Sequence, residues 1–216
     1  MQGALPEIVS LARAARVRID HVPRAAIDAR ATTRMHQGVI AEAAAVPARS
    51  WREGLQRARD AGEPALFLAL DGIEDPHNAG ALVRSAEVFG AHSVLLPKRR
   101  GSPLSAAMAK AAAGALEHVI VDQVTNMDHA LAECRDEGLW VVALASDGNQ
   151  PLDTCALLEE PVVIVVGKEG TGVSSLLRKR ADAIVAIPTV GRVGSLNASV
   201  AGAVALWETA RKRRSR

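Results

Sequence analysis

Residues 162–172 read Val-Val-Ile-Val-Val-Gly-Lys-Glu-Gly-Thr-Gly, an apolar run that ends in a glycine-rich turn. Five consecutive β-branched residues suit a strand that is buried on both faces, as the strands of parallel sheets are. The three glycines that follow allow positive φ and a close approach of the backbone to a ligand. The segment therefore predicts an inner strand of an α/β sheet with a ligand site at its carboxyl end.

Short apolar runs of the same kind recur from residue 65 onward, and helical patterns separate them. We predict one six-stranded parallel sheet, with strands at 65–70, 93–96, 118–121, 139–145, 162–166 and 183–187. Helices are predicted at 78–89, 104–114, 127–137, 174–180 and 197–213. The chain has 216 residues, 49% of them hydrophobic, which is enough for one such domain with a small appendage.

The first 46 residues predict a small α/β piece, with a helix at 5–15 and strands at 17–22 and 38–43. Residues 47–63 are interpreted as a connector that contains a short helix. The expected organisation is an N-terminal piece over 1–46, a connector over 47–63 and the main domain over 64–216.

Composition excludes several classes of protein. No apolar run reaches the roughly 18 residues that a membrane span requires, and no secretory signal is recognised at the start. Cys134 and Cys155 form no CxxC pair, which favours idle thiols in a reducing compartment and hence a cytoplasmic protein. The six histidines show no HExxH or clustered spacing, so we expect no metal.

The net charge of +2 conceals an uneven distribution. Residues 64–210 carry 11 lysines and arginines against 17 aspartates and glutamates, whereas five of the last six residues are basic. Such a tail can follow RNA phosphates, or it can be the solvated end of a helix.

Polar residues follow two further strands of the predicted sheet. In residues 71–85 (DGIEDPHNAGALVRS), Asp75 and Pro76 suit the start of a helix. Asn78 and Arg84 lie about 240° apart if both are helical, so they share a site only if Asn78 sits in or near the loop. Otherwise they are a helix cap and a surface arginine.

Residues 188–203 (PTVGRVGSLNASVAGA) lead into the last helix, which Ser195 or Asn197 can cap. The small residues allow another backbone to pass close by, as a threaded chain would require.

The glycine-rich turn is neither a Walker loop nor a dinucleotide fingerprint, because Lys168 precedes Glu169 and no GxGxxG follows the first strand. Glu169 would also repel phosphates. The turn suits an adenosine compound without phosphates, or it is an ordinary connection capped by Ser174.

Together the three segments resemble the three motifs of the SpoU/TrmH branch of the SPOUT methyltransferases, in particular the bacterial 23S rRNA guanosine 2'-O-methyltransferases. The resemblance covers residues 36–213 and is carried by 70–85 (LDGIEDPHNAGALVRS), 167–172 (GKEGTG) and 187–199 (IPTVGRVGSLNAS). It implies a deep trefoil knot at the carboxyl end, a homodimer, and transfer of a methyl group from S-adenosylmethionine to a ribose 2'-hydroxyl of RNA, with rRNA favoured over tRNA.

The same resemblance assigns site residues. Three positions match those whose backbone holds the cofactor's adenine, namely Gly167, Ile187 and Leu196. Five match the polar active-site set, namely Asn78, Arg84, Glu169, Ser195 and Asn197. Residues 35–41 (MHQGVIA) resemble the end of the family's N-terminal RNA-binding module, whose usual opening strand and helix have no counterpart before Leu5. We therefore expect a truncated or divergent module, and Gly194 is a further departure because close relatives usually carry serine there.

The resemblance casts Arg84 as the base, but a guanidinium stays protonated at ordinary pH. We hypothesise that Arg84 stabilises the developing alkoxide while phosphate or water takes the proton. Asn78 and Asn197 would shape the site, and Glu169 and Ser195 would position the substrate or Arg84.

Two basic clusters offer phosphate contacts or are solvated surface, namely Lys98, Arg99 and Arg100, and Arg178, Lys179 and Arg180. With two Phe, three Trp and no Tyr, the chain lacks an aromatic platform for stacking bases.

Three alternatives stay open at this point. The chain could be a tRNA ribose methyltransferase, whose motifs are similar. It could be a non-catalytic RNA-binding or ribosome-assembly factor that kept the fold. It could also be a nicotinamide-dependent oxidoreductase, although the missing dinucleotide fingerprint argues against that.

Overall fold

The computed structural model describes residues 4–31, 36–42, 49–192 and 194–214. The chain divides into two compact units, Met1–Pro47 and Ala48–Arg216.

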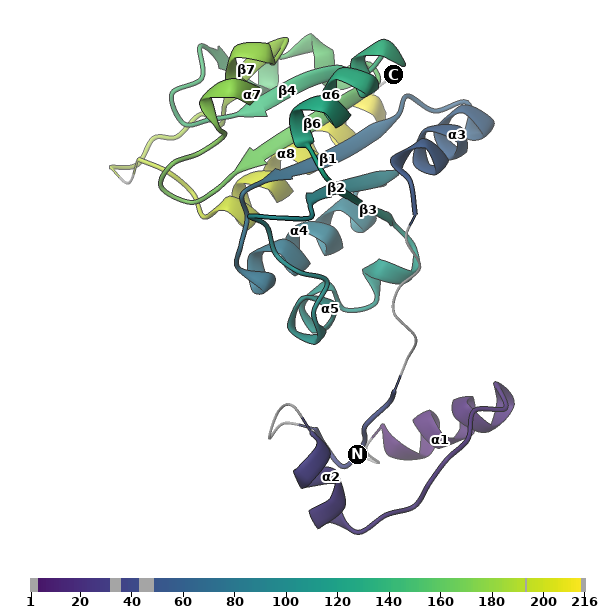
Figure 1. Cartoon of the computed structure of the whole chain (residues 1–216). Helices are drawn as coiled ribbons and strands as arrows, with labels where there is room; N and C mark the ends of the chain where they lie inside the picture. Colours follow the sequence, from purple (N-terminus) through teal and green to yellow (C-terminus); the bar gives the residue numbers. More distant parts are fainter. Residues whose placement is uncertain (1–3, 32–35, 43–48, 193, 215–216) are drawn as a thin grey trace. The chain divides into compact units, whose positions relative to one another are not determined.

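The larger unit is built on one parallel sheet with the strand order β3-β2-β1-β6-β4-β7-β5 (Figure 1). The strands are β1 (Leu66–Asp71), β2 (Ser93–Pro97), β3 (Ile120–Val124), β4 (Trp140–Leu144), β5 (Gln150–Pro151), β6 (Val162–Gly167) and β7 (Ala183–Ala186). The parallel α/β class is confirmed, and each of the six predicted strands is present. The sheet has a seventh strand, β5, which was missed because two residues carry no periodic signal.

Helices cover both faces of the sheet (Figure 1). They are α3 (Trp51–Ala61), α4 (Pro76–Val88), α5 (Ala106–Ala112), α6 (Met127–Asp136), α7 (Ser175–Arg180) and α8 (Ala198–Arg214), with short 3-10 turns at Ala115–Glu117, Leu152–Thr154 and Ala156–Glu159. Strand β1 shows how the two layers form, because Leu68 points into the core under α4, α5 and α8, whereas Phe67 points into the core under α3, α6 and α7. This alternation follows from the two-residue period of a strand.

The central pair of strands is β1 and β6, which run in register from Leu66 opposite Val162 to Asp71 opposite Gly167. Both strands are almost completely buried. Because the pair is parallel, the loops that follow Asp71 and Gly167 leave the sheet side by side at its carboxyl edge. The trefoil knot stays a prediction that rests on the family resemblance.

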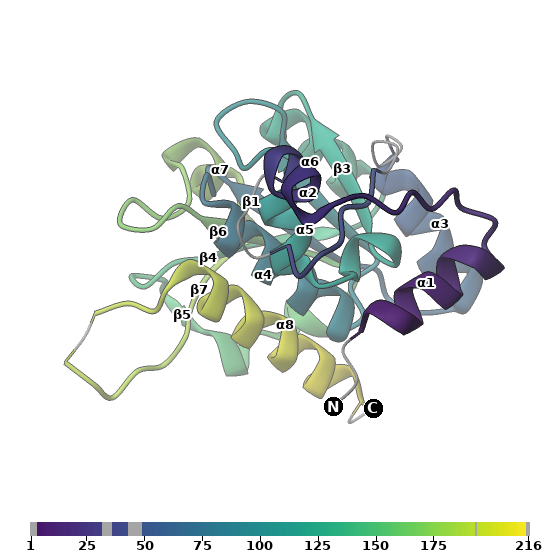
Figure 2. The same cartoon turned by 90° about the horizontal axis from the view of Figure 1, so that it is seen from below.

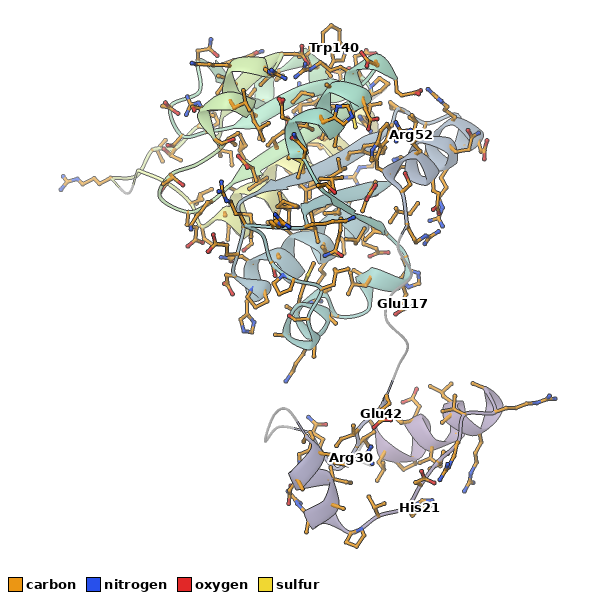
Figure 3. All side chains as sticks on the ribbon, in the orientation of Figure 1. His21, Arg30, Glu42, Arg52, Glu117 and Trp140 are labelled. Atoms are coloured by element: carbon orange, nitrogen blue, oxygen red, sulfur yellow. The ribbon has the colours of Figure 1, made fainter. Side chains whose placement is uncertain are left out.

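The unit Met1–Pro47 contains two helices in its described part, α1 (Leu5–Ala14) and α2 (Arg24–Arg30). The prediction of strands at 17–22 and 38–43 is wrong for the residues that the structure describes, which pair with no strand, and residue 43 lies outside them. A strand needs a hydrogen-bonded partner, and an alternating pattern cannot supply one. An ion pair of Arg30 with Glu42 (Figure 3) and a hydrogen bond of 2.8 Å between His36 and Asp28 lie within this unit.

None of the described helices combines the length and the apolar composition that crossing a membrane would require.

The basic end of α8 is part of the folded structure as far as Arg214. The guanidinium of Arg213 donates to the carbonyl oxygens of Leu158 at 3.0 Å, Pro64 at 2.6 Å and Ala65 at 3.2 Å, and also to that of Glu160. Burial lowers the pKa of Arg213 to about 10, which leaves it charged near neutral pH. Arg213 therefore ties the end of α8 to the start of β1 and to the segment before β6.

We expect the substitution Arg213→Ala to lower the free energy of unfolding by about 2 kcal/mol, because it leaves carbonyl groups without their donor. Urea unfolding followed by circular dichroism measures the effect. The matched control is Arg214→Ala, which removes an exposed arginine from the next position of the same helix. Equal stabilities of the two variants would contradict the anchoring role.

Candidate active site

A cleft of about 380 Å³ opens at the carboxyl ends of β4, β6 and β7. The ends of β4 and β6, the loops that follow β4, β6 and β7, and the first turn of α8 line it, namely Leu144, Ala145, Ser146, Val166, Gly167, Lys168, Glu169, Gly170, Gly172, Ile187, Thr189, Gly194, Ser195, Leu196, Asn197, Ala198 and Ala201. Segments far apart in the sequence meet here because parallel strands bring their carboxyl ends to one edge of the sheet. In Figures 1 and 2 the described residues between β7 and α8 (187–192 and 194–197) extend away from the sheet, and residues near both ends of this connection line the cleft.

The structure brings six of the eight predicted site residues to the cleft. These are Gly167, Glu169, Ile187, Ser195, Leu196 and Asn197. The sequence analysis missed the cleft residues at the end of β4 and directly after it, from Leu144 to Ser146. The end of that predicted strand was a usable signal, because the carboxyl ends of parallel strands lie at the same edge. Thr189 was also missed.

The glycine-rich turn after β6 folds back tightly on itself. The backbone N–H of Gly172 donates to the carbonyl of Lys168 at 2.7 Å. A Cβ added to Gly167 would lie 2.0 Å from the carbonyl carbon of Gly172, which is closer than real Cβ atoms come. Only glycine fits at position 167, and the turn presents main-chain groups to the cleft.

The last residue of β1 holds the segment that follows the glycine-rich turn. The backbone N–H of Ser174 donates to the carboxylate of Asp71 at 2.7 Å. Ser174 stands at the N-cap of α7, but its side chain makes no capping hydrogen bond. The alternative of a turn capped by the Ser174 side chain is therefore wrong.

Asn78, Glu169 and Asn197 form one hydrogen-bonded network. Asn78 Nδ2 donates to Glu169 Oε1 at 3.1 Å, and Asn197 Nδ2 donates to Asn78 Oδ1 at 3.1 Å and also to Glu169 Oε1. The three residues come from the first turn of α4, the β6 turn and the start of α8. The positive end of the α8 dipole lies beside the Glu169 carboxylate and stabilises its charge.

Two predicted helix caps are confirmed, at the starts of α8 and α4. Asn197 Oδ1 accepts from the backbone N–H groups of Ser199 at 2.9 Å and Val200 at 3.3 Å, as an N-cap side chain does. Asp75 accepts from the backbone N–H of His77 at 3.0 Å and is followed by Pro76 at the first position of α4. Asn78 reaches the network from the first turn of α4, next to the loop that precedes the helix.

Arg84 lies elsewhere on α4. It is exposed and does not line the cleft. Six residues of helix separate it from Asn78 by about 9 Å along the axis and about 240° around it. Within one chain, the structure does not bring Arg84 to the network.

The cysteines and potential metal ligands give no second site. Both cysteines are buried, and burial raises the pKa of the Cys134 thiol to about 12, so that thiol stays protonated. Across the described residues, no three His, Cys, Asp or Glu side chains come close enough to hold a metal ion.

Size and chemistry of the cleft fit a small organic molecule with a flat ring. Its volume lies within the range of small-molecule sites. Apolar side chains such as Leu144, Ile187 and Leu196 line the cleft together with main-chain groups of the β6 turn. The carboxylate of Glu169 would repel a phosphate group. S-adenosylmethionine, which carries an adenosine, a positive sulfonium and no phosphate, meets these conditions.

Comparisons with known proteins agree with this chemistry. The sequence model of the SpoU rRNA Methylase family matches residues 65–207, and a model described as RNA 2'-O ribose methyltransferase substrate binding matches residues 2–48. YacO of Bacillus subtilis, which is assigned to the TrmH family of tRNA/rRNA methyltransferases, is 36% identical over 99% of this chain and 85% of its own length. An uncharacterized tRNA/rRNA methyltransferase of Mycolicibacterium vanbaalenii is 42% identical over 98% of this chain and 67% of its own length.

Solved structures show the same fold. The SpoU methyltransferase AviRb of Streptomyces viridochromogenes, solved in complex with S-adenosylmethionine, superimposes with a TM-score of 0.65 at 25% identity over 70% of this chain. This chain spans 59% of the length of AviRb. The TrmH/SpoU tRNA modifying enzyme of A. aeolicus gives a TM-score of 0.63 at 26% identity, over 76% of this chain and 84% of that enzyme.

The parallel sheet and its glycine-lined cleft thus define an S-adenosylmethionine-dependent RNA methyltransferase. More particularly, the chain belongs to the SpoU/TrmH family of tRNA/rRNA methyltransferases. The family predicted from the three sequence motifs is confirmed.

We expect the substitution Gly167→Ala to weaken binding of S-adenosylmethionine by at least about tenfold, or about 1.4 kcal/mol, because the new Cβ forces the β6 turn open. Isothermal titration calorimetry measures the affinity. Gly191→Ala is the matched control, because a Cβ at that position meets nothing within 4 Å. A Gly167→Ala variant that binds as tightly as the control would show that the turn does not hold the cofactor.

Proposed function

We propose that this protein methylates a ribose 2'-hydroxyl of RNA, and that a guanosine of 23S rRNA is its substrate nucleoside. The observation that carries the proposal is the network of Asn78, Glu169 and Asn197 beside the glycine-lined cleft. It sets a carboxylate and two amides at the point where a substrate hydroxyl would meet a cofactor held in the cleft. The match of residues 2–48 to a 2'-O ribose methyltransferase substrate-binding model supports the choice of the ribose oxygen.

The cofactor would be held chiefly by the backbone. Gly167 ends β6, whereas Ile187 and Leu196 lie near the two ends of the connection between β7 and α8. The main-chain groups of these three residues would bind the adenine edge. When bound, S-adenosylmethionine supplies an electrophilic methyl group. The enzyme's own task is then to orient the ribose oxygen and to favour loss of its proton.

The network is suited to orientation. Glu169 Oε1 accepts from the two asparagine amides, and the backbone N–H of Ala198 lies 3.5 Å from it. The described residues place no donor on Glu169 Oε2, which leaves that oxygen to receive a hydrogen bond from the substrate. Ser195, at the cleft wall, would position the ribose or the guanidinium that acts on it.

A homodimer would complete this site. A groove between α4 and α8 is lined by Ala81, Ser85, Phe89, Ser199, Val200, Ala203, Val204 and Trp207. Large apolar side chains are exposed along it, with Val200 48% and Trp207 45% exposed, and Val88 beside them on α4 is 63% exposed. An apolar surface of this kind favours an isologous contact with a second copy.

The groove also gives Arg84 a place in the mechanism. It begins at Ser199 and Val200, immediately after the cleft residues Asn197 and Ala198, and Arg84 stands on α4 next to the groove residue Ser85. A second copy docked on the groove would bring its Arg84 toward the cleft of the first. Its guanidinium would then stabilise the alkoxide that forms as water or phosphate accepts the proton.

We expect Arg84→Ala to reduce methyl transfer to background while binding of S-adenosylmethionine persists, since the guanidinium acts on the substrate oxygen. A radioactive methyl-transfer assay and calorimetry measure the two properties. Arg57→Ala, which removes an arginine from the exposed face of α3, serves as the control and should retain full activity. Parallel loss of transfer and cofactor binding in Arg84→Ala would count against the assignment.

A mixing experiment tests whether two chains share one site. Arg84→Ala and Glu169→Ala chains should each be inactive alone, whereas co-expressed chains should recover about a quarter of wild-type activity, because half of randomly paired dimers are mixed and each mixed dimer has one intact site. Activity that stays at background in purified mixed dimers would place both residues of one site on the same chain.

The substrate is tested by methylation of separated rRNA and tRNA, followed by mapping of 2'-O-methyl positions. The tRNA alternative is supported by the likeness to the A. aeolicus tRNA modifying enzyme. A protein that binds S-adenosylmethionine but methylates neither RNA would contradict the proposed function. The RNA substrate and the buried, unpaired thiols support a cytoplasmic location.

A further inference from the structure

We propose that the loop between β2 and α5 binds the phosphates of the substrate RNA beside the active site. This basic loop comprises residues 98–101, and the inference rests on the proposed RNA methyltransferase function. Three observations carry it: the backbone of the loop is fixed, its position adjoins the site, and its charges are unpaired.

The backbone of the basic loop is anchored at both ends. The N–H of Lys98 donates to the carbonyl of Val124 at 2.9 Å, and the N–H of Ser102 donates to the carbonyl of Ile73 at 2.7 Å. A Cβ added to Gly101 would lie 2.6 Å from the Pro97 ring, so the turn is packed against its own strand. A fixed backbone presents cations to a ligand at a lower entropic cost than a mobile tail does.

The loop lies at the same edge of the sheet as the cleft. Gly72 has a φ of +74°, and the position of a Cβ on it lies 3.7 Å from Lys168 Cβ and 4.0 Å from the Arg100 carbonyl oxygen. Gly72 therefore lies close to both the basic loop and the β6 turn. A polyanion whose ribose reaches the network of Asn78, Glu169 and Asn197 would leave the site beside the basic loop.

The charges of the basic loop are available to a ligand. Lys98, Arg99 and Arg100 are all exposed, and the described part of the chain shows no ion pair for any of them. Residues 64–210 are acidic on balance, with 17 acidic against 11 basic residues, and the basic loop holds three of those 11. A local surplus of positive charge beside the site favours an anionic strand at this place.

Two of the three cations in the competing cluster, Arg178 and Arg180 of α7, are paired with carboxylates. Arg178 makes two hydrogen bonds of 2.9 Å to Asp147, and Arg180 lies 2.6 Å from Asp128. RNA would have to break these ion pairs before it could bind there. Of the two basic clusters in the sequence, the structure therefore favours residues 98–100 for phosphate contact.

The test is the triple substitution Lys98→Ala, Arg99→Ala and Arg100→Ala. Binding of a short fluorescein-labelled single-stranded RNA is measured by anisotropy over a series of salt concentrations. The slope of log K against log salt should become shallower by about 2 if all three cations meet phosphates, at roughly 0.7 for each contact. The KM for rRNA should rise about tenfold or more at low salt, while kcat at saturating RNA and the affinity for S-adenosylmethionine stay at wild-type values.

A control with the same change of charge is Arg52→Ala, Arg57→Ala and Arg59→Ala on α3 (Figure 3). Arg57 donates to the carbonyl of His118, just before β3, so this face lies at the amino ends of the strands. A second variant, Lys98→Arg, Arg99→Lys and Arg100→Lys, keeps the charge and should bind RNA as the wild type does.

An unchanged salt slope in the alanine variant, or an equal loss in the α3 control, would overturn the proposal. The outcome is separable from the proposed function. If the wild type methylates no RNA but the alanine variant shows the expected change of salt slope, the proposed activity is contradicted and the proposed RNA-binding role of the loop is supported. If the wild type is active and the alanine variant binds RNA as the wild type does, the proposed role of the loop is contradicted and the proposed activity is supported.

Discussion

The pairing of Asp71 with Gly167, at the carboxyl ends of β1 and β6, determines the geometry of the whole site. The loop after β1 leads from this point into α4, whose first turn carries Asn78. The turn after β6 carries Glu169. The Asp71 carboxylate then holds the far side of the β6 turn through the N–H of Ser174. A shift of one residue in this pairing would separate Asn78 from Glu169, so the buried interior that fixes the register of the two strands also fixes the site.

The sequence predicted the main sheet well because its strands are buried on both faces and therefore read as continuous β-branched runs. It failed in the N-terminal unit, where the alternation at 17–22 has the composition of a strand and finds no neighbour to pair with. Burial explains the difference. A run such as Val162 to Val166 can be stable only inside a sheet, whereas a half-apolar segment is compatible with an exposed, unpaired chain.

The site was predicted in part for a similar reason. At positions such as Gly167, Asp75 and Asn197 the residue type itself predicts the local geometry, because few other residues suit a tight turn or a helix cap. Helical spacing also correctly separated Asn78 from Arg84. It could not show that Asn78 reaches Glu169 from the first turn of α4, because that contact depends on a loop 91 residues away in the chain.

The distribution of basic residues shows why a count of charges is a poor guide to RNA binding in this protein. The densest basic segment, at the end of α8, includes Arg213, whose guanidinium is occupied by backbone carbonyls. Arg178 and Arg180 of the second cluster are paired with Asp147 and Asp128. These arginines use their charge within the fold, whereas the described residues show no ion pair for Lys98, Arg99 or Arg100. A cation that already has a partner must lose it before it binds a phosphate. To predict which basic residues bind RNA, one must therefore know which of them form ion pairs in the folded chain.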